Sequence, residues 1–198
     1  MRSPVAALSA IAETVRAIAV DDDTRAELIG LVLAACRGIE RLVGDLDLAS
    51  VRRERVEVVP LVANAVAGAR LRGLDVEIAT VDGAPVVDGD PTRLRQAFDN
   101  VLANALTHAG GSDVLVMVGR VKSAVEIAVA DRGGGIPESE HDRVLEPGVR
   151  LDDSKPGSGL GLAVTRAVVE AHGGRVSIRA TEGGGATVVI SLPVAPNA

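Results

Sequence analysis

Large apolar residues recur every three or four positions near the start of the chain, from Leu8 to Ile18 and again from Leu28 to Leu46. This spacing predicts two helices with a heptad seam, separated by the acidic stretch DDDT. A joint this short requires an antiparallel hairpin. One hairpin cannot cover its own seam, so we expect two copies to pair in a four-helix bundle. Packing of the hairpin on the C-terminal part of its own chain is the alternative.

After residue 52 the pattern changes to shorter elements of both kinds. Helices are expected from Pro60 to about residue 72, over 91–108, and through about residue 171. The segments DVEIATVD, VLVMVGRV and AVEIAVAD alternate as strands, and the last strands form a hairpin that turns at 183–185. Because helices and strands are mixed rather than strictly alternating, we expect an α+β fold with two layers, not a doubly wound sheet.

Composition fits two modules, a hairpin over residues 1–52 and one domain over 53–195. With 198 residues, 47% of them hydrophobic, the chain can bury a core and still supply a smaller module. The net charge of −6 argues against a nucleic-acid partner. No apolar run is long enough for a membrane span, so we expect no membrane contact by this chain. The single cysteine, Cys36, is compatible with a reducing cytosol.

The helix expected over 91–108 has two distinct faces. Its core face carries Leu94, Phe98, Val101, Leu102 and Ala105. A separate polar stripe carries Gln96, Asn100, Asn104, Thr107 and His108. Exposed helix faces usually carry Lys, Glu or Arg, and Asn is a poor helix former. Two Asn four residues apart therefore suggest amide groups that bind a ligand, although a merely solvated face would show a similar pattern.

Two glycine-rich segments add candidate chemistry. In ADRGGGIP, Asp131 stands where a strand ends, so its carboxylate could accept a hydrogen bond from a buried donor such as an adenine amino group. In KPGSGLGLAV, three glycines at alternate positions precede a helix, where backbone N–H groups favour an anion. The spacing matches neither a Walker loop nor a dinucleotide fingerprint.

The order of these segments is more specific than any one of them. QAFDNVLANAL, DRGGGIP, RVLEPGVR, GSGLGLAV and GGGATVVISLP resemble, in sequence, the N, G1, F, G2 and G3 boxes of the ATP-binding domain of sensor histidine kinases. These kinases share a superfamily with gyrase, the Hsp90 chaperones and the MutL repair proteins. The resemblance implies a two-layer sandwich that binds ATP and Mg²⁺.

The start of the chain extends the resemblance. RSPVAAL is similar to the downstream half of the kinases' phosphoacceptor box, in which the histidine stands five residues before the proline. Counted back from Pro4, that histidine falls two residues before Met1, so we expect the phosphoacceptor to lie outside this chain. The resemblance also gives Ser3 a possible role in dephosphorylating the partner regulator.

The resemblance assigns the nucleotide site residue by residue. Asn104 is expected to bind Mg²⁺, and Asn100 to contact phosphate or metal nearby. Asp131 is expected to read the adenine amino group, while Gly133 and Gly135 let the base approach.

The remaining implied residues lie around the lid, between Pro137 and Gly157. The segment from Gly157 through Gly159 and Leu160 to Gly161 is expected to hold phosphates by backbone N–H groups. Two lid cations, Arg150 and Lys155, are expected to meet phosphate charge, and Thr187 to support the adenine pocket.

Departures from the family pattern concern the same site. Thr107 and His108 replace the usual basic and aromatic residues, so we expect weaker phosphate contact from this helix. Leu145 stands where the family commonly has Phe, so we expect loose docking of the lid.

None of His108, His141 and His172 has the setting of a phosphoacceptor. A structural role or contact with the nucleotide is expected for each of them instead.

The function implied is that of the catalytic core of a two-component sensor histidine kinase. It would work as a homodimer with a response regulator receiver domain as partner, in the cytoplasmic portion of an inner-membrane sensor. A split kinase or an anti-sigma-type kinase of the same superfamily is one alternative. A non-catalytic, nucleotide-responsive dimerisation and docking module is the other.

Overall fold

The computed structural model describes residues 53–81, 85–111, 113–152, 154 and 158–196. The expected helical hairpin, with Ser3 and Cys36, lies outside the described residues, as do Lys155 and Gly157. None of the described helices is both long and apolar enough to cross a membrane.

A five-stranded sheet forms one layer of the described domain. Its strands are β2 (Val76–Val81), β4 (Val114–Val121), β5 (Ala124–Ala130), β7 (Ala186–Pro193) and β6 (Arg175–Ala180), in that order across the sheet. The first pair is parallel and the other three pairs are antiparallel. Because consecutive strands here are joined both by hairpins and by a helical crossover, the sheet is mixed, as expected for an α+β fold.

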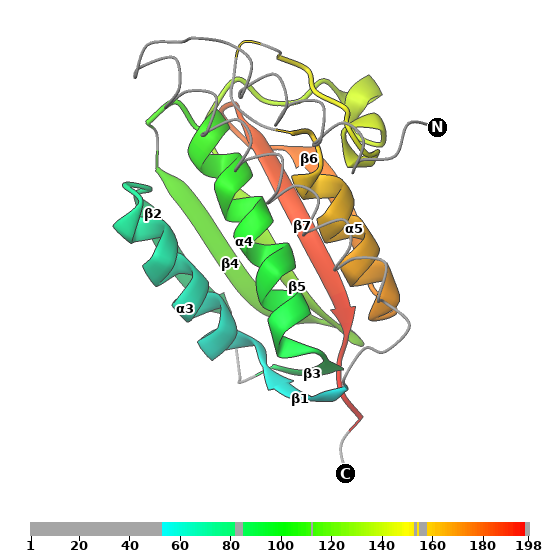
Figure 1. The fold of residues 1–198 in the computed structure, drawn as a ribbon. Coiled ribbons are helices and arrows are strands. Elements are labelled where there is room, and N and C mark those ends of the chain that lie inside the picture. Colours follow the sequence, from blue (N-terminus) through cyan, green and yellow to red (C-terminus); the bar gives the residue numbers. More distant parts are fainter. Residues whose placement is uncertain (1–52, 82–84, 112, 153, 155–157, 197–198) are drawn as a thin grey trace, which may run out of the picture. The chain divides into compact units, whose positions relative to one another are not determined.

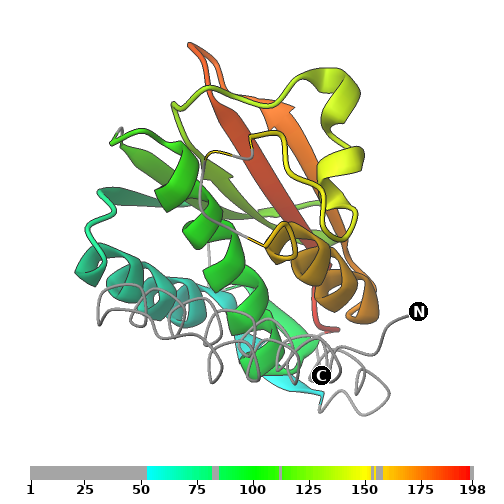
Figure 2. The same ribbon diagram turned by 45° about the horizontal axis from the view of Figure 1, so that its top comes forward.

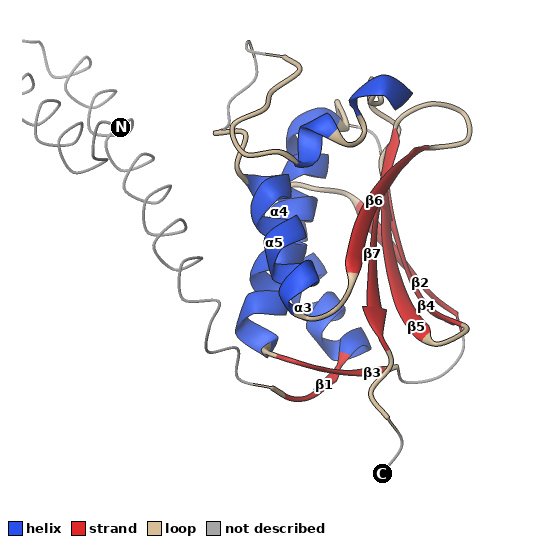
Figure 3. Ribbon diagram, turned by 90° about the vertical axis from the view of Figure 1, so that its right-hand side faces the viewer, coloured by secondary structure: helices blue, strands red, loops and turns tan. Residues whose placement is uncertain are grey.

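Three helices form the second layer, on one face of the sheet (Figure 3). They are α3 (Val58–Leu71), α4 (Pro91–His108) and α5 (Gly161–Ala171), and α4 lies between the other two (Figure 1). The two-layer arrangement expected for this part of the chain is therefore confirmed. Helix α3 begins two residues before Pro60, because proline is tolerated within the first helical turn.

The sequence pattern missed a small second sheet at the lower end of Figure 1, made by β1 (Glu54–Glu57) and β3 (Val86–Gly89). Each strand has four residues, which is too short for a clear alternation. Their pairing buries Val56 and Val87, so it depends on contacts between distant parts of the chain. Two short 3₁₀ helices, Glu138–Glu140 and Arg143–Leu145, were also missed and lie beyond the first turn of α5 (Figure 2).

The core lies between the helices and the sheet. The whole predicted core face of α4 is buried, including Phe98, the only aromatic residue of the protein, which is 1% exposed. Opposite it, the inward side chains of the strands are mostly valine. β-branched residues fit a pleated surface that is buried on one face. The apolar positions of the helices and those of the strands therefore form the same core.

His172 joins the end of α5 to the start of α4. Its ring is 3% exposed, and its Nε2 accepts a hydrogen bond of 2.9 Å from the backbone N–H of Asp90. Nδ1 therefore carries the proton and donates to the carbonyl of Val168 at 2.7 Å. A Cβ atom at Gly89 would lie 2.5 Å from the ring, so a larger residue there would displace the histidine. Of the two roles expected for His172, the structural one is observed.

We predict that His172→Phe lowers the free energy of unfolding by about 2 kcal/mol, since it keeps the ring but leaves the N–H of Asp90 buried without an acceptor. Urea unfolding of the full chain measures this. Glu170→Gln, on the exposed face of the same helix, is the control and should change the free energy by less than about 0.5 kcal/mol. Equal stabilities for wild type and His172→Phe would contradict the role given to the ring.

Candidate functional site

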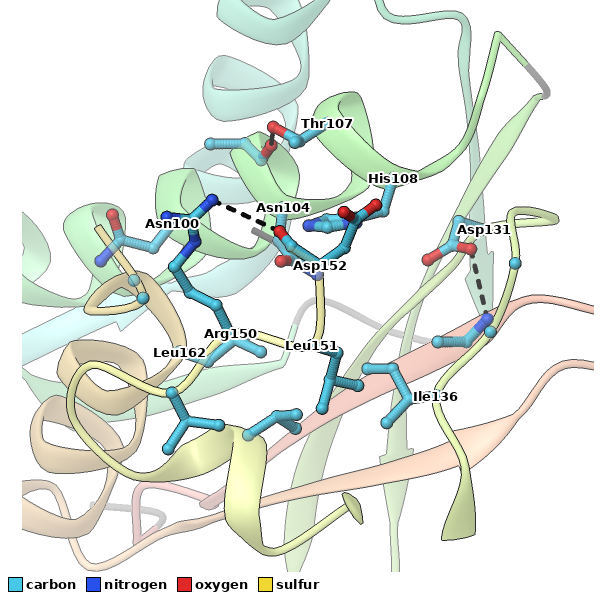
Figure 4. Close-up of a pocket in the computed structure, with 18 of the residues that line it drawn as sticks. Asn100, Asn104, Thr107, His108, Asp131, Ile136, Arg150, Leu151, Asp152 and Leu162 are labelled. Carbon is cyan, nitrogen blue, oxygen red and sulfur yellow. Dashed lines mark hydrogen bonds between the residues drawn. The ribbon is translucent and has the colours of Figure 1, made fainter. Parts of the chain in front are cut away.

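A cavity of about 370 Å³ opens between α4, the end of β5, the lid and the first turn of α5. This size is within the range of small-ligand sites. Figure 4 shows side chains from all four segments pointing into it. The cavity therefore brings together residues that are as far apart in the sequence as Asn100 and Ala186.

Helix α4 supplies the polar wall. Its start is set by Asp90, whose Oδ1 accepts hydrogen bonds from the N–H groups of Thr92 (2.9 Å) and Arg93 (3.1 Å). With the core face buried, the stripe at Asn100, Asn104, Thr107 and His108 faces the cavity, as predicted. The Thr107 hydroxyl donates to the Ala103 carbonyl of the same helix at 2.9 Å.

Gln96, the first residue of the predicted stripe, does not line the cavity. Its side-chain oxygen accepts a hydrogen bond of 3.3 Å from Arg93 instead. It lies one turn before Asn100, so the cavity covers only the C-terminal half of α4.

Asn100 has an amide nitrogen that no described residue satisfies. The Nδ2 atom is buried and has no hydrogen-bond partner. Gly161, the first residue of α5, lies directly opposite, where a Cβ atom would be 3.8 Å from the Asn100 Cβ. Buried polar groups are normally paired, so this orphaned donor points to a ligand that supplies an acceptor oxygen.

Asp131 is 5% exposed and closes the other end of the cavity. Its Oδ1 accepts hydrogen bonds from the backbone N–H groups of Gly133 (2.9 Å) and Ala186 (3.2 Å). These bonds fix the carboxylate, and its second oxygen faces the cavity (Figure 4). A buried carboxylate held in this way can accept one further hydrogen bond from a ligand donor.

Gly133 has a different role from the one expected. A Cβ atom there would lie 2.1 Å from the carbonyl oxygen of His108, so the missing side chain lets the loop pack on the end of α4. The glycines that line the cavity are Gly134 and Gly135, the latter with a positive φ of 72°. Gly135 therefore lines the cavity and Gly133 packs against α4, because the direction of close approach depends on tertiary packing.

Thr187 does not line the cavity either. It is 4% exposed, and its hydroxyl pairs with that of Thr181 at 2.9 Å. The lining residue of β7 is Ala186, one position earlier, which is also bonded to Asp131. Any support from Thr187 is therefore indirect, through the position of the strand.

A hydrogen bond joins the middle of the lid to the segment just after it. The N–H of Gly148 donates to the carbonyl of Gly159 at 3.1 Å, and a Cβ atom at Gly159 would lie 2.8 Å from the backbone of Gly148. Gly159, Gly161 and Arg150 all line the cavity, as predicted, whereas Leu160 does not.

Leu145 docks the lid firmly, against expectation. It is 5% exposed and belongs to the hydrophobic core, together with Val144. Leucine is smaller than phenylalanine but still buries a full aliphatic side chain, so the substitution does not expose this part of the lid.

Sequence reasoning missed four lid residues that line the cavity, Val144, Val149, Leu151 and Asp152. The Oδ1 of Asp152 accepts hydrogen bonds from the N–H (3.0 Å) and the hydroxyl (2.5 Å) of Ser154. Arg150 donates to the Asp152 carbonyl at 3.3 Å (Figure 4). The sequence offers only the acidic pair DD at this point, which does not indicate that Asp152 faces the cavity.

The charges lining the cavity are Asp131, Asp152 and Arg150. Within the described residues no group of three His, Cys, Asp or Glu side chains could hold a metal ion by itself. A cation would therefore need further oxygen ligands from a bound molecule.

Outside the cavity, hydrogen bonding to Glu170 raises the pKa of Arg166 on the exposed face of α5.

Comparison with known proteins agrees with this geometry. Residues 89–196 match the family described as histidine kinase-, DNA gyrase B-, and HSP90-like ATPase. The sensor-type histidine kinase PrrB of Mycobacterium tuberculosis is 32% identical over 203 residues, which span 98% of this chain and 45% of PrrB. The sensor-like histidine kinase SenX3 of Mycolicibacterium smegmatis is 32% identical, over 100% of this chain and 56% of SenX3.

A solved structure of a relative has a similar fold. The ATP binding domain of PrrB from Mycobacterium tuberculosis aligns with a TM-score of 0.61 at 32% identity, covering 73% of this chain and 98% of that domain. The chain spans about half the length of the two curated relatives, 45% of PrrB and 56% of SenX3.

The family match covers more than half of the chain and includes α4, Asp131, the lid and α5. The chain therefore belongs to the histidine kinase-, DNA gyrase B-, and HSP90-like ATPases, and its described domain is a catalytic domain of the sensor histidine kinase type.

Proposed function

We propose that the cavity binds ATP with Mg²⁺ and that the domain transfers the γ-phosphoryl group to a histidine, for relay to a response regulator. The observation that carries this proposal is the pairing of a fixed carboxylate, Asp131, at one end of the cavity with the unpartnered amide of Asn100 at the other. The first suits a purine amino group and the second suits a phosphate oxygen.

The adenine end is mostly apolar around Asp131. Ile136 and Ala186 line it with aliphatic surface, which suits the faces of a base. The free oxygen of Asp131 accepts from the exocyclic amino group of adenine. A guanine oxygen at that place would face the carboxylate without a proton between them, so the site favours adenine.

The phosphate end is polar. Asn100, Arg150 and the backbone at Gly159 and Gly161 bind the phosphates, with the N-terminus of α5 favouring negative charge. We place Lys155 and Gly157 with this group, and His108 beside the nucleotide. Thr187 stabilises the adenine end through its strand.

The residues present fit a magnesium ion. Asn104 supplies a neutral oxygen on the cavity wall beside the unpartnered Asn100, and Mg²⁺ commonly takes few protein ligands, together with phosphate oxygens and waters. When bound, the ion neutralises phosphate charge. The protein then contributes mainly by positioning the γ-phosphoryl group in line with a histidine nitrogen.

The acceptor histidine is proposed to come from outside the described domain. The three histidines of the protein all have other surroundings. His108 lines the cavity, His141 lies 3.0 Å from the Ile136 carbonyl through Nε2, and His172 is buried. An acceptor must instead reach the phosphate end from another segment or another chain.

The wider setting follows from the same proposal. Residues 1–52 are proposed to form the dimerisation hairpin, with Ser3 assisting dephosphorylation, and residues 53–195 the catalytic domain. The homodimer would meet a receiver domain in the cytoplasm, as part of a membrane sensor. The helical seam in the sequence supports dimerisation, and the relatives' names as sensor kinases support the rest.

We predict that Asp131→Asn weakens binding of a non-hydrolysable ATP analogue with Mg²⁺ by about tenfold or more, because an amide donor can replace the acceptor for the adenine amino group. Calorimetry measures the affinity. Asp88→Asn, on β3 and outside the cavity, should bind like wild type. Unchanged affinity in folded Asp131→Asn would remove Asp131 from the site.

We further predict where phosphate will appear after incubation with γ-³²P-ATP. Label should transfer to a separately supplied dimerisation domain that bears a phosphoacceptor histidine, and should not remain on this polypeptide. Electrophoresis under alkaline conditions preserves and detects phosphohistidine. Label on His108, His141 or His172 would refute the assignment of an outside acceptor.

A further inference from the structure

The lid carries an exposed leucine at the cavity. Leu151 is 45% exposed and, among the described residues, it is the one exposed large apolar side chain that lines the cavity. Single exposed leucines are common on protein surfaces, so exposure alone indicates no function. The question is therefore what an apolar side chain does at this place in the cavity.

Leu151 extends an aliphatic surface that begins in the core. Four other aliphatic side chains line the cavity and also belong to the core or pack against it, namely Ile136, Val144, Val149 and Leu162. Figure 4 shows the side chains of Leu151 and Ile136 close together, across the cavity from the labelled residues of α4. The polar wall on α4 thus faces an apolar wall to which the lid contributes Leu151.

The stability of the folded domain does not account for this leucine. Unlike the other four side chains, Leu151 is not part of the hydrophobic core that the described residues form. An exposed aliphatic side chain gains free energy when another apolar surface covers it. Since Leu151 lines the cavity, a bound molecule can supply that surface.

One part of the proposed ligand has a surface of this kind. The triphosphate and the cation are charged and hydrated, whereas the faces of a nucleic-acid base stack readily on apolar side chains. The base is proposed to lie at Asp131 and Ile136, and Leu151 is close to Ile136 (Figure 4). Leu151 is therefore placed to cover a face of the base.

We propose that Leu151 packs on a face of the adenine base, so that the lid contributes to nucleotide affinity through the base as well as through the phosphates. Leu151 then binds the nucleotide by apolar contact, together with Ile136. This inference rests on the proposed ATP function. It deepens that function by assigning a lid residue to recognition of the base.

The test measures the dissociation constants of a non-hydrolysable ATP analogue and of ADP, by calorimetry on the full chain with Mg²⁺. Leu151→Ala removes most of the apolar contact, so we expect both nucleotides to bind about fivefold more weakly. The factor should be the same for both, because both carry the same base. The heat capacity change of binding should also become less negative, since less apolar surface is buried.

Three controls separate contact with the base from an effect on the fold. Leu151→Met keeps an apolar side chain of similar size, so both affinities should stay within about twofold of wild type. Leu71→Ala changes a leucine on α3 that is 91% exposed and outside the cavity, and it should leave both affinities unchanged. Without nucleotide, Leu151→Ala should unfold at the same temperature as wild type, because this side chain is not part of the core.

The outcomes separate this inference from the proposed function. Unchanged affinities in Leu151→Ala, or weaker binding of only one of the two nucleotides, would overturn the contact with the base and leave the ATP site intact. Equal weakening by Leu151→Met, or a lower unfolding temperature of Leu151→Ala without nucleotide, would also overturn it, since either result would indicate a role in the fold of the lid. Absence of binding of both nucleotides to wild type would overturn the proposed function, and this inference with it.

Discussion

The site depends on the close contact between α4 and α5. Thr165, which is fully buried, places its hydroxyl 3.1 Å from the carbonyl of Ala97 and 2.9 Å from that of Gly161. At the far end, His172 ties α5 to the cap of α4. The contacts from Thr165 to Ala97 and from His172 to Asp90 join the middle and the C-terminal end of α5 to the N-terminal half of α4. The distance between Asn100 and Gly161, and hence the room at this end of the cavity, is set by this packing.

A second set of contacts fixes the end of the cavity at Asp131, and it relies on glycine. A Cβ atom at Gly185 would lie 2.0 Å from the carbonyl oxygen of Asp131, and one at Gly133 would lie 2.1 Å from that of His108. The β6–β7 hairpin, the Asp131 loop and the end of α4 therefore meet backbone to backbone. Such contacts leave little freedom, so the Asp131 carboxylate is oriented before any ligand binds.

The lid combines a rigid base with an exposed inner segment. Val144 and Leu145 anchor it in the core, and the Gly148–Gly159 hydrogen bond joins its middle to the segment just after it. Arg150, Leu151 and Asp152 lie between these anchors and face the cavity. A segment that is anchored at both ends can present charged groups to a ligand without contributing to the core. The helices α4 and α5 thus position neutral groups at the cavity, and the lid supplies charged groups.

Local patterns in the sequence determined the elements and most of their faces. The cap at Asp90, the apolar spacing of α4 and the alternation of the long strands each act over a few residues, so they predict helix, strand and buried side without knowledge of the fold. The order of five motifs then predicted the cavity and its main residues. Only the tertiary structure decided that Gln96 falls short of the cavity, that Gly133 serves packing, and that β1 pairs with β3. It also decided that Asp152 lines the cavity. In each case the outcome depends on which distant backbone comes within a few ångströms, and no periodicity along the chain contains that information.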